Sequence, residues 1–91
     1  MTVTIRIPAA LRAYSGGQAE LVLVAANVRS ALESIQRSHP ALYCSICDET
    51  GTVRRHVNLF VNMAHMRDRD GLDTALAPGD VLTILPAVSG G

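Results

Sequence analysis

Apolar and polar residues alternate over residues 2–7, which is the period-two pattern of a half-buried β-strand. Pro8 ends this predicted strand. The turn-forming sequence Ser-Gly-Gly-Gln at 15–18 predicts a hairpin turn, and residues 19–24 follow it as a second, mostly apolar strand. We expect the two strands to pair antiparallel. The residues predicted to face the core from the first strand are Val3, Ile5 and Ile7.

A helix is predicted next, because apolar residues recur at the i, i+3, i+4, i+7 spacing of one buried face. Asn27 is a suitable N-cap, and Pro40 is expected to stop the helix near His39. On the exposed side, Glu33 lies four residues from both Arg29 and Arg37, so two weak ion pairs are expected. The predicted buried face consists of Val28, Ala31, Leu32 and Ile35.

The second half of the chain predicts more strands than helices. Residues 41–55 show no sustained period, so a short helical turn and a loop are expected there. Residues 56–62 alternate strongly and predict a third strand, and a short edge strand is expected around residues 65–67. The residues predicted to face the core from the third strand are Val57, Leu59 and Val61.

The last strand is predicted to begin at Val81, after a type II turn over residues 77–80 in which Gly79 takes the position that needs positive φ. Pro86 cannot donate to a β-ladder and marks the end of this strand. A helical turn before it is expected to close the core. Its predicted core residues are Leu72, Ala75 and Leu76.

These elements predict an α+β fold in which one main helix packs across a mixed sheet of four to five strands. The first and last strands are apolar enough to lie side by side in the middle of that sheet. The chain has 91 residues, which fits one domain. We expect a folded domain over residues 1–86 and a flexible C-terminal tail over residues 87–91.

Composition narrows the classes of partner. The eight basic side chains are all Arg, they balance eight acids, and there are only three aromatic residues, so a nucleic-acid surface is not expected. No apolar run approaches the roughly 20 residues of a membrane helix, and the N-terminus lacks signal-peptide character. A protein of the cytoplasm that binds neither nucleic acid nor a membrane is therefore expected.

The tail ends in the pair Gly90-Gly91, preceded by the small residues Ala87, Val88 and Ser89. Without Cβ atoms a diglycine can thread a narrow channel, so the carboxylate of Gly91 is expected to be a substrate group on which a partner enzyme acts. The other four tail residues are expected to be recognised as the tail threads that channel. No catalytic residue and no metal ligand is expected in this chain.

The chain resembles the MoaD/ThiS sulfur carriers, which have the ubiquitin-like β-grasp fold. Three stretches carry the resemblance: Gly71-Leu72-Asp73-Thr74-Ala75-Leu76, Pro78-Gly79-Asp80, and Leu85 through Gly91. The opening Ile7-Pro8-Ala9-Ala10-Leu11-Arg12, the Ser15–Gln18 turn and Phe60-Val61-Asn62 are most similar to the CysO-type branch. The resemblance covers essentially the whole chain.

This resemblance implies that the chain is a carrier and not an enzyme, and that it binds no cofactor of its own. A ubiquitin-activating-enzyme-like adenylyltransferase of the MoeB/ThiF type would use ATP and magnesium to adenylate Gly91, and a sulfur donor would then displace AMP. In the CysO-type branch, the resulting thiocarboxylate attacks an aminoacrylate that a cysteine-synthase-like enzyme holds on pyridoxal phosphate. A metallopeptidase then releases cysteine.

Other functions stay open at this stage. The chain could be the small subunit of molybdopterin synthase, a sulfur donor for another thio-cofactor or natural product, or a protein-tagging modifier. It could also be a β-grasp interaction module whose diglycine has no role.

Cys44 and Cys47 depart from the family pattern and allow three interpretations. They could be zinc ligands together with His39 and His56, although that spacing fits no standard motif. They could form a redox pair, although the strand-to-helix context of thioredoxin-type motifs is absent. The interpretation that we favour is a pair of reduced cysteines that fill a small apolar site.

Overall fold

Five strands form one mixed sheet in the computed structural model, which describes residues 2–86. Their order across the sheet is β2-β1-β5-β3-β4, so β5 is central and β1 lies beside it. β1 pairs antiparallel with β2 and parallel with β5, and β5 pairs antiparallel with β3. The predicted mixed sheet is thus confirmed. The strands are β1 (Val3–Arg6), β2 (Glu20–Leu23), β3 (Val57–Val61), β4 (Ala64–His65) and β5 (Val81–Pro86).

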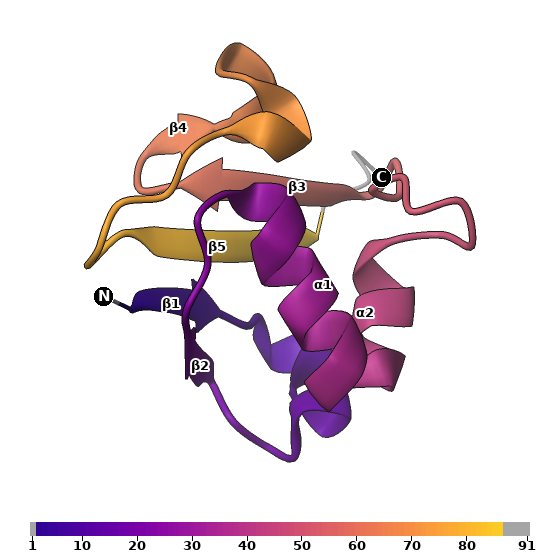
Figure 1. Ribbon diagram of the computed structural model, residues 1–91. Coiled ribbons are helices and arrows are strands. Elements are labelled where there is room, and N and C mark those ends of the chain that lie inside the picture. The colour runs from indigo at the N-terminus through magenta and orange to yellow at the C-terminus, as the bar shows by residue number, and fades with distance from the viewer. Residues whose placement is uncertain (1, 87–91) are drawn as a thin grey trace.

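One face of the sheet is covered by helices, and α1 (Val28–Ser38) crosses it as the main helix (Figure 1). The expected turn after Pro40 is a two-turn helix, α2 (Pro40–Ile46), which packs against α1. Three 3₁₀ segments complete the fold: η1 (Ala9–Ser15), η2 (Met66–Asp68) and η3 (Gly71–Asp73). The core lies between the sheet and the two α-helices.

The inward positions predicted from the sequence are confirmed. The core residues predicted from the first and third strands and from the helix are all buried, and Leu82 and Ile84 of β5 are fully buried. The opposite face of the sheet, which we call the helix-free face, is not buried. Each described outward residue of the five strands is partly or largely exposed there. That face carries Thr4, Arg6, Glu20, Val22, Asn58, Phe60, His65, Val81, Thr83 and Leu85.

The predicted cap of the main helix is confirmed, but its ion pairs are not. The Asn27 side chain accepts a hydrogen bond from the Ser30 backbone at 2.8 Å, and Ser30 Oγ in turn accepts from the Asn27 backbone at 3.2 Å. Of the expected helix pairs with Glu33, neither occurs among the described residues. Arg29 instead reaches the Asp73 carboxylate at 3.3 Å, because η3 packs against the start of α1.

The connection between the first two strands is longer than the predicted hairpin turn. After Pro8 the chain forms η1, and Gly16 ends that segment in the left-handed conformation with φ of 69°. Gly17 follows with φ of 82°, and the chain then enters β2. The glycines therefore cap a 3₁₀ segment, although the antiparallel pairing of the two strands is as predicted.

The segment before the last strand corrects one predicted core residue. Leu76 is buried and Leu72 is partly buried, as expected, but Ala75 is exposed and Thr74 takes the inward position. Ala75 forms an isolated bridge with Asn27, so the chain is extended here and helical spacing does not apply. The Thr74 hydroxyl donates to the Gly71 carbonyl at 2.7 Å and accepts from the Asp70 backbone at 3.1 Å, which satisfies this buried polar group.

The start of β5 is fixed by a hydrogen-bond network that links it to the end of β3. The predicted turn is confirmed, since Gly79 has φ of 87° and the Asp80 backbone donates to the Ala77 carbonyl at 3.0 Å. Asn62 adopts φ of 55°, and its side chain accepts from the Val81 backbone at 3.0 Å and donates to the Asp80 carboxylate at 3.2 Å. These bonds fix the register of β5 at its first residue.

Asp80 makes this network sensitive to acid. Hydrogen bonds from the Ala77 backbone and the Asn62 side chain favour the carboxylate and lower the pKa of Asp80 below 3.8. Because the folded pKa lies below the unfolded one, the stabilisation is full above pH 3.8 and is lost as pH falls through the folded pKa.

We predict that Asp80→Asn makes the free energy of unfolding less dependent on pH between about pH 5 and pH 2, because this group no longer titrates. Urea unfolding followed by circular dichroism at several pH values measures this, with Asp68→Asn as a matched control on an exposed segment. An unchanged pH dependence in Asp80→Asn, or an equal change in the control, would contradict the prediction.

Candidate functional site

The candidate site is the end of β5, the last strand that the structure describes. Pro86 is exposed and lies opposite Val57, and Leu85 is 43% exposed on the helix-free face. Directly before them, Ile84 is fully buried between β1 and β3. The strand therefore changes from core to surface within two residues. The predicted site residues Ala87, Val88, Ser89, Gly90 and Gly91 follow at once and lie outside the described residues.

A surface hollow of about 340 Å³ lies beside this strand end. Arg6 and Glu20 form an exposed ion pair at 3.7 Å on its wall, and Arg12 Nε donates to the Ile7 carbonyl at 3.1 Å. Sequence reasoning gave none of these three residues a role in the site, although Arg6 stands on the predicted polar face of the first strand and Arg12 belongs to the stretch that resembles the CysO-type branch. The lining residues are Arg6, Ile7, Pro8, Arg12, Ala19, Glu20, Thr83, Ile84 and Leu85.

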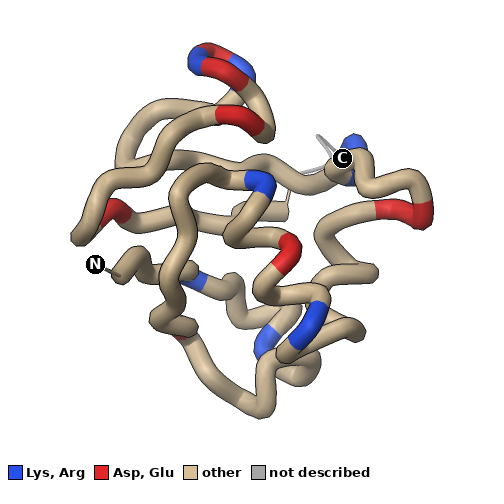
Figure 2. Tube along the Cα trace, in the orientation of Figure 1, with Lys and Arg blue, Asp and Glu red and all other residues tan. Residues whose placement is uncertain are grey.

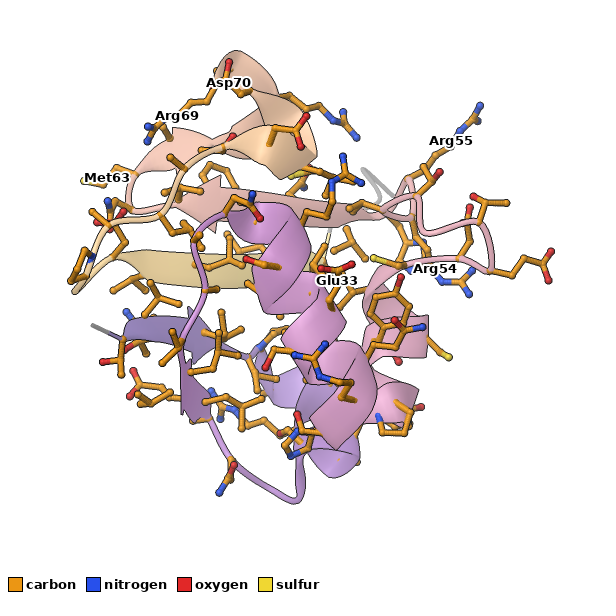
Figure 3. The ribbon with its side chains drawn as sticks, in the orientation of Figure 1. Glu33, Arg54, Arg55, Met63, Arg69 and Asp70 are labelled. Atoms are coloured by element: carbon orange, nitrogen blue, oxygen red, sulfur yellow. The ribbon has the colours of Figure 1, made fainter. Side chains whose placement is uncertain are left out.

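Two more arginines precede β3, the strand that pairs with the end of β5. Arg54 lies back against the end of α2, where its Nε donates to the Cys44 carbonyl at 2.8 Å, and Arg55 extends away from the molecule (Figure 3). Val57, the residue opposite Pro86, comes two positions after Arg55. Acidic and basic positions are otherwise interspersed along the chain (Figure 2). The strand end thus has guanidinium groups nearby, which suit an acidic or phosphate-bearing partner surface.

Cys44 and Cys47 lie at the end of α2 in different environments. Cys44 is exposed, whereas Cys47 is 2% exposed and belongs to the core. Burial raises the pKa of Cys47 to about 11, although the neighbouring Tyr43 hydroxyl partly opposes this shift. The favoured interpretation is confirmed for Cys47 alone, because Cys44 fills no apolar site.

The metal-binding interpretation finds no support within residues 2–86. No group of three or more His, Cys, Asp and Glu side chains in this part of the chain is placed to hold an ion. The Nδ1 atom of His39 lies within hydrogen-bond distance of Ser38 Oγ, at 2.9 Å.

Within residues 2–86, every helix is too short or too polar to span a membrane.

Comparison with known proteins shows which family the chain belongs to. The ThiS family model matches residues 5–91, which is nearly the whole chain, and the chain belongs to this family. The sulfur carrier protein CysO of Mycobacterium tuberculosis strain H37Rv is 36% identical over 93 residues, covering all of both chains.

Two solved structures are similar over almost their full length. The structure of the Amycolatopsis orientalis BexX/CysO complex matches with a TM-score of 0.88 and 34% identity, covering 98% of this chain and 99% of the other. Small archaeal modifier protein 1 of Methanosarcina acetivorans matches with a TM-score of 0.84 and 33% identity, covering 99% and 96%. The expected ubiquitin-like β-grasp fold and the resemblance to CysO-type sulfur carriers are therefore confirmed.

The different environments of the two thiols predict different reactivity. We expect iodoacetamide at pH 8 to alkylate Cys44 rapidly and to leave Cys47 unmodified until the protein unfolds, because Cys47 is buried and its pKa of about 11 keeps it protonated. Peptide mass spectrometry with and without urea measures this, and Cys44→Ser isolates the slow site. Equal rates for the two cysteines in the folded protein would contradict the assignment.

Proposed function

We propose that this chain is a sulfur carrier whose Gly91 carboxylate is converted by partner enzymes to a thiocarboxylate. The observation that supports the proposal most is the position of β5. It is the central strand, fixed on both sides, and it ends at exposed Pro86 directly before the tail. The family match also runs through Gly91, and the full-length relative is a sulfur carrier.

The proposed chemistry takes two steps, the first at the α-phosphorus of ATP and the second at the acyl carbon of Gly91. A Gly91 carboxylate oxygen attacks the α-phosphorus of ATP, which the activating partner binds with magnesium, and pyrophosphate leaves. A sulfur nucleophile then attacks the acyl carbon and AMP leaves with the bridging oxygen. Activation is needed because a carboxylate is a poor electrophile. The carrier supplies a shaped surface and an end, and the adenylyltransferase supplies the catalysis.

We further propose that the sulfur goes to cysteine. In this route the thiocarboxylate sulfur attacks the β-carbon of an unsaturated amino acid that a cysteine-synthase-like partner holds with its pyridoxal phosphate. A metallopeptidase then releases the product from the carrier. The full-length likeness to CysO supports this route over the other sulfur acceptors.

We also propose that the activating partner docks on the helix-free face next to the strand end. Leu85 and Thr83 of β5 stand on this face, Leu85 beside Asn58 and Thr83 between Arg6 and Phe60 in the sheet register. A partner seated there would cover exposed Leu85 and receive the tail from Pro86 without disturbing the core. The arginines near the strand end, which are Arg6, Arg12, Arg54 and Arg55, would contact acidic groups on that partner.

A second candidate function is protein modification, which the likeness to small archaeal modifier proteins favours. In that case the activated Gly91 would be transferred to an amine instead of to sulfur. Detection of isopeptide-linked adducts on lysines of other host proteins would favour this function over sulfur transfer. The chain itself has no lysine side chain to accept a second copy.

Removal of Gly91 tests the proposal directly. We expect the rate of thiocarboxylate formation to fall at least about 100-fold, because the new carboxylate stops one residue, roughly 3.5 Å, short of the nucleotide. Thiocarboxylation is measured by intact mass spectrometry after incubation with ATP, magnesium, a sulfide source and host extract. Thermal unfolding should not change. Full modification of the shortened chain would overturn the proposal, and Met63→Ala serves as the unaffected control.

The docking assignment has a separate test. We expect Leu85→Asp to raise the KM for the carrier in adenylation about tenfold with little effect on kcat, because it places a charge in the proposed contact but not at the reacting carbon. Met63→Asp is the matched control, since Met63 is 95% exposed at the opposite end of the sheet from Arg54 and Arg55 (Figure 3). Pyrophosphate release measures both. Equal KM values for the two variants would contradict the assignment.

A further inference from the structure

β2 is an unpaired edge of the sheet. It lies beside β1 at one end of the strand order, and no other strand formed by residues 2–86 lies on its other side (Figure 1). The opposite edge strand, β4, has only two residues and runs directly into η2, whereas β2 has four. β2 therefore presents the longer free edge of the described sheet.

The pairing register shows which backbone groups point outward from this edge. The Ile7 backbone donates to the Ala19 carbonyl at 2.8 Å, and Leu21 and Leu23 lie opposite Ile5 and Val3 in the same register. Because hydrogen-bonded and non-hydrogen-bonded positions alternate in an antiparallel pair, the backbone groups of Glu20 and Val22 point away from β1. Those of Val24 do so too if the strand continues by one residue.

The side chains at this edge lack the usual protection against strand pairing. Val22 is 67% exposed and Val24 is 72% exposed, and residues 20–24 contain neither proline nor lysine. The one charge, Glu20, is already paired with Arg6 at 3.7 Å. An exposed apolar edge with free donors and acceptors fits another extended strand.

We propose that β2 pairs antiparallel with β2 of a second copy of this chain, with Val22 opposite its own copy on a two-fold axis. In this register Glu20 lies opposite the partner's Val24, so all three outward residues of each copy form hydrogen-bonded pairs. A shift by two residues would leave one of them unpaired.

Side-chain packing and charge agree with this register. Val22 meets its own copy and lies diagonal to the partner's Val24, so four valines form one apolar cluster on the helix-free face. The two Glu20 residues are four positions apart along the ladder, roughly 13 Å, which exceeds the Debye length of about 8 Å at physiological salt. The chain has no net charge, so the copies do not repel one another overall.

The contact is small, so the association is expected to be weak. A ladder of five residues buries less than the roughly 800 Å² per partner of a stable complex. β1 separates β2 from β5, so the tail-bearing strand takes no part in the pairing. The proposed dimer therefore goes beyond the proposed carrier function, and each of the two proposals can be wrong without the other.

Sedimentation equilibrium from micromolar to millimolar concentration tests the pairing. The average mass should rise from 9.7 kDa towards twice that value. Val22→Arg should abolish the rise, because two like charges then meet at the axis, while Met63→Arg should leave it unchanged. A constant monomer mass at millimolar concentration, or a dimer that survives Val22→Arg, would overturn the proposal. Circular dichroism verifies that each variant is folded.

Cross-linking tests the register. In a Cys44→Ser background, Val22→Cys should form a disulfide-linked dimer under mild oxidation by oxidised glutathione, because opposed residues in a hydrogen-bonded pair lie within disulfide range. Val24→Cys should cross-link at least about tenfold more slowly, since it lies opposite Glu20. Faster cross-linking through position 24, or none at either position, would overturn the two-fold register.

Discussion

The fixed position of β5 is the constraint on which the rest of this structure depends. Its inward side chains Leu82 and Ile84 are fully buried, and its backbone pairs with β1 on one side and β3 on the other. Asn62 and Asp80 hold its first residues through side-chain hydrogen bonds. The strand is thus held at its start and along both edges, and within the described residues its outward end is the exposed pair Leu85 and Pro86. The candidate site is therefore a consequence of how the core is closed.

This arrangement separates stability from function along the chain. The residues that hold β5 are at the turn and in the core, whereas Leu85 and Pro86 are exposed and contribute little to that core. A partner can therefore bind the strand end and the helix-free face without competing with the contacts that keep the protein folded. Such a division suits the proposed carrier role, because partner enzymes could act at the end of the chain while the contacts of the core stay in place.

The sequence was sufficient to predict the main elements because their patterns are long and regular. The alternation of Val57, Leu59 and Val61 and the capped helix after Asn27 required no tertiary information. The tail stays a prediction, which rests on two glycines after a strand that ends in proline, because residues 87–91 lie outside the described part of the chain.

Other features depend on contacts that periodicity does not encode. α2 has only seven residues, too few for a clear helical period, and its place is set by packing against α1 and η1. Thr74 is buried because its hydroxyl is satisfied within the 70–74 loop, and polar character alone would have placed it outside. The hollow beside the strand end joins Arg12 of η1 to residues of three strands, so it exists only after folding.

The central claim is that Gly91 carries sulfur, and the mass of the protein from its native host tests it most directly. The chain would be purified without reductants or amine buffers, and its C-terminal peptide would be fragmented to locate any change. The account predicts one carboxylate oxygen replaced by sulfur at Gly91, or cysteine attached there, during growth that demands sulfur. The contradicting result is a Gly91 carboxylate that stays unmodified during that growth and also after incubation with ATP, magnesium, a sulfide source and the host's own extract.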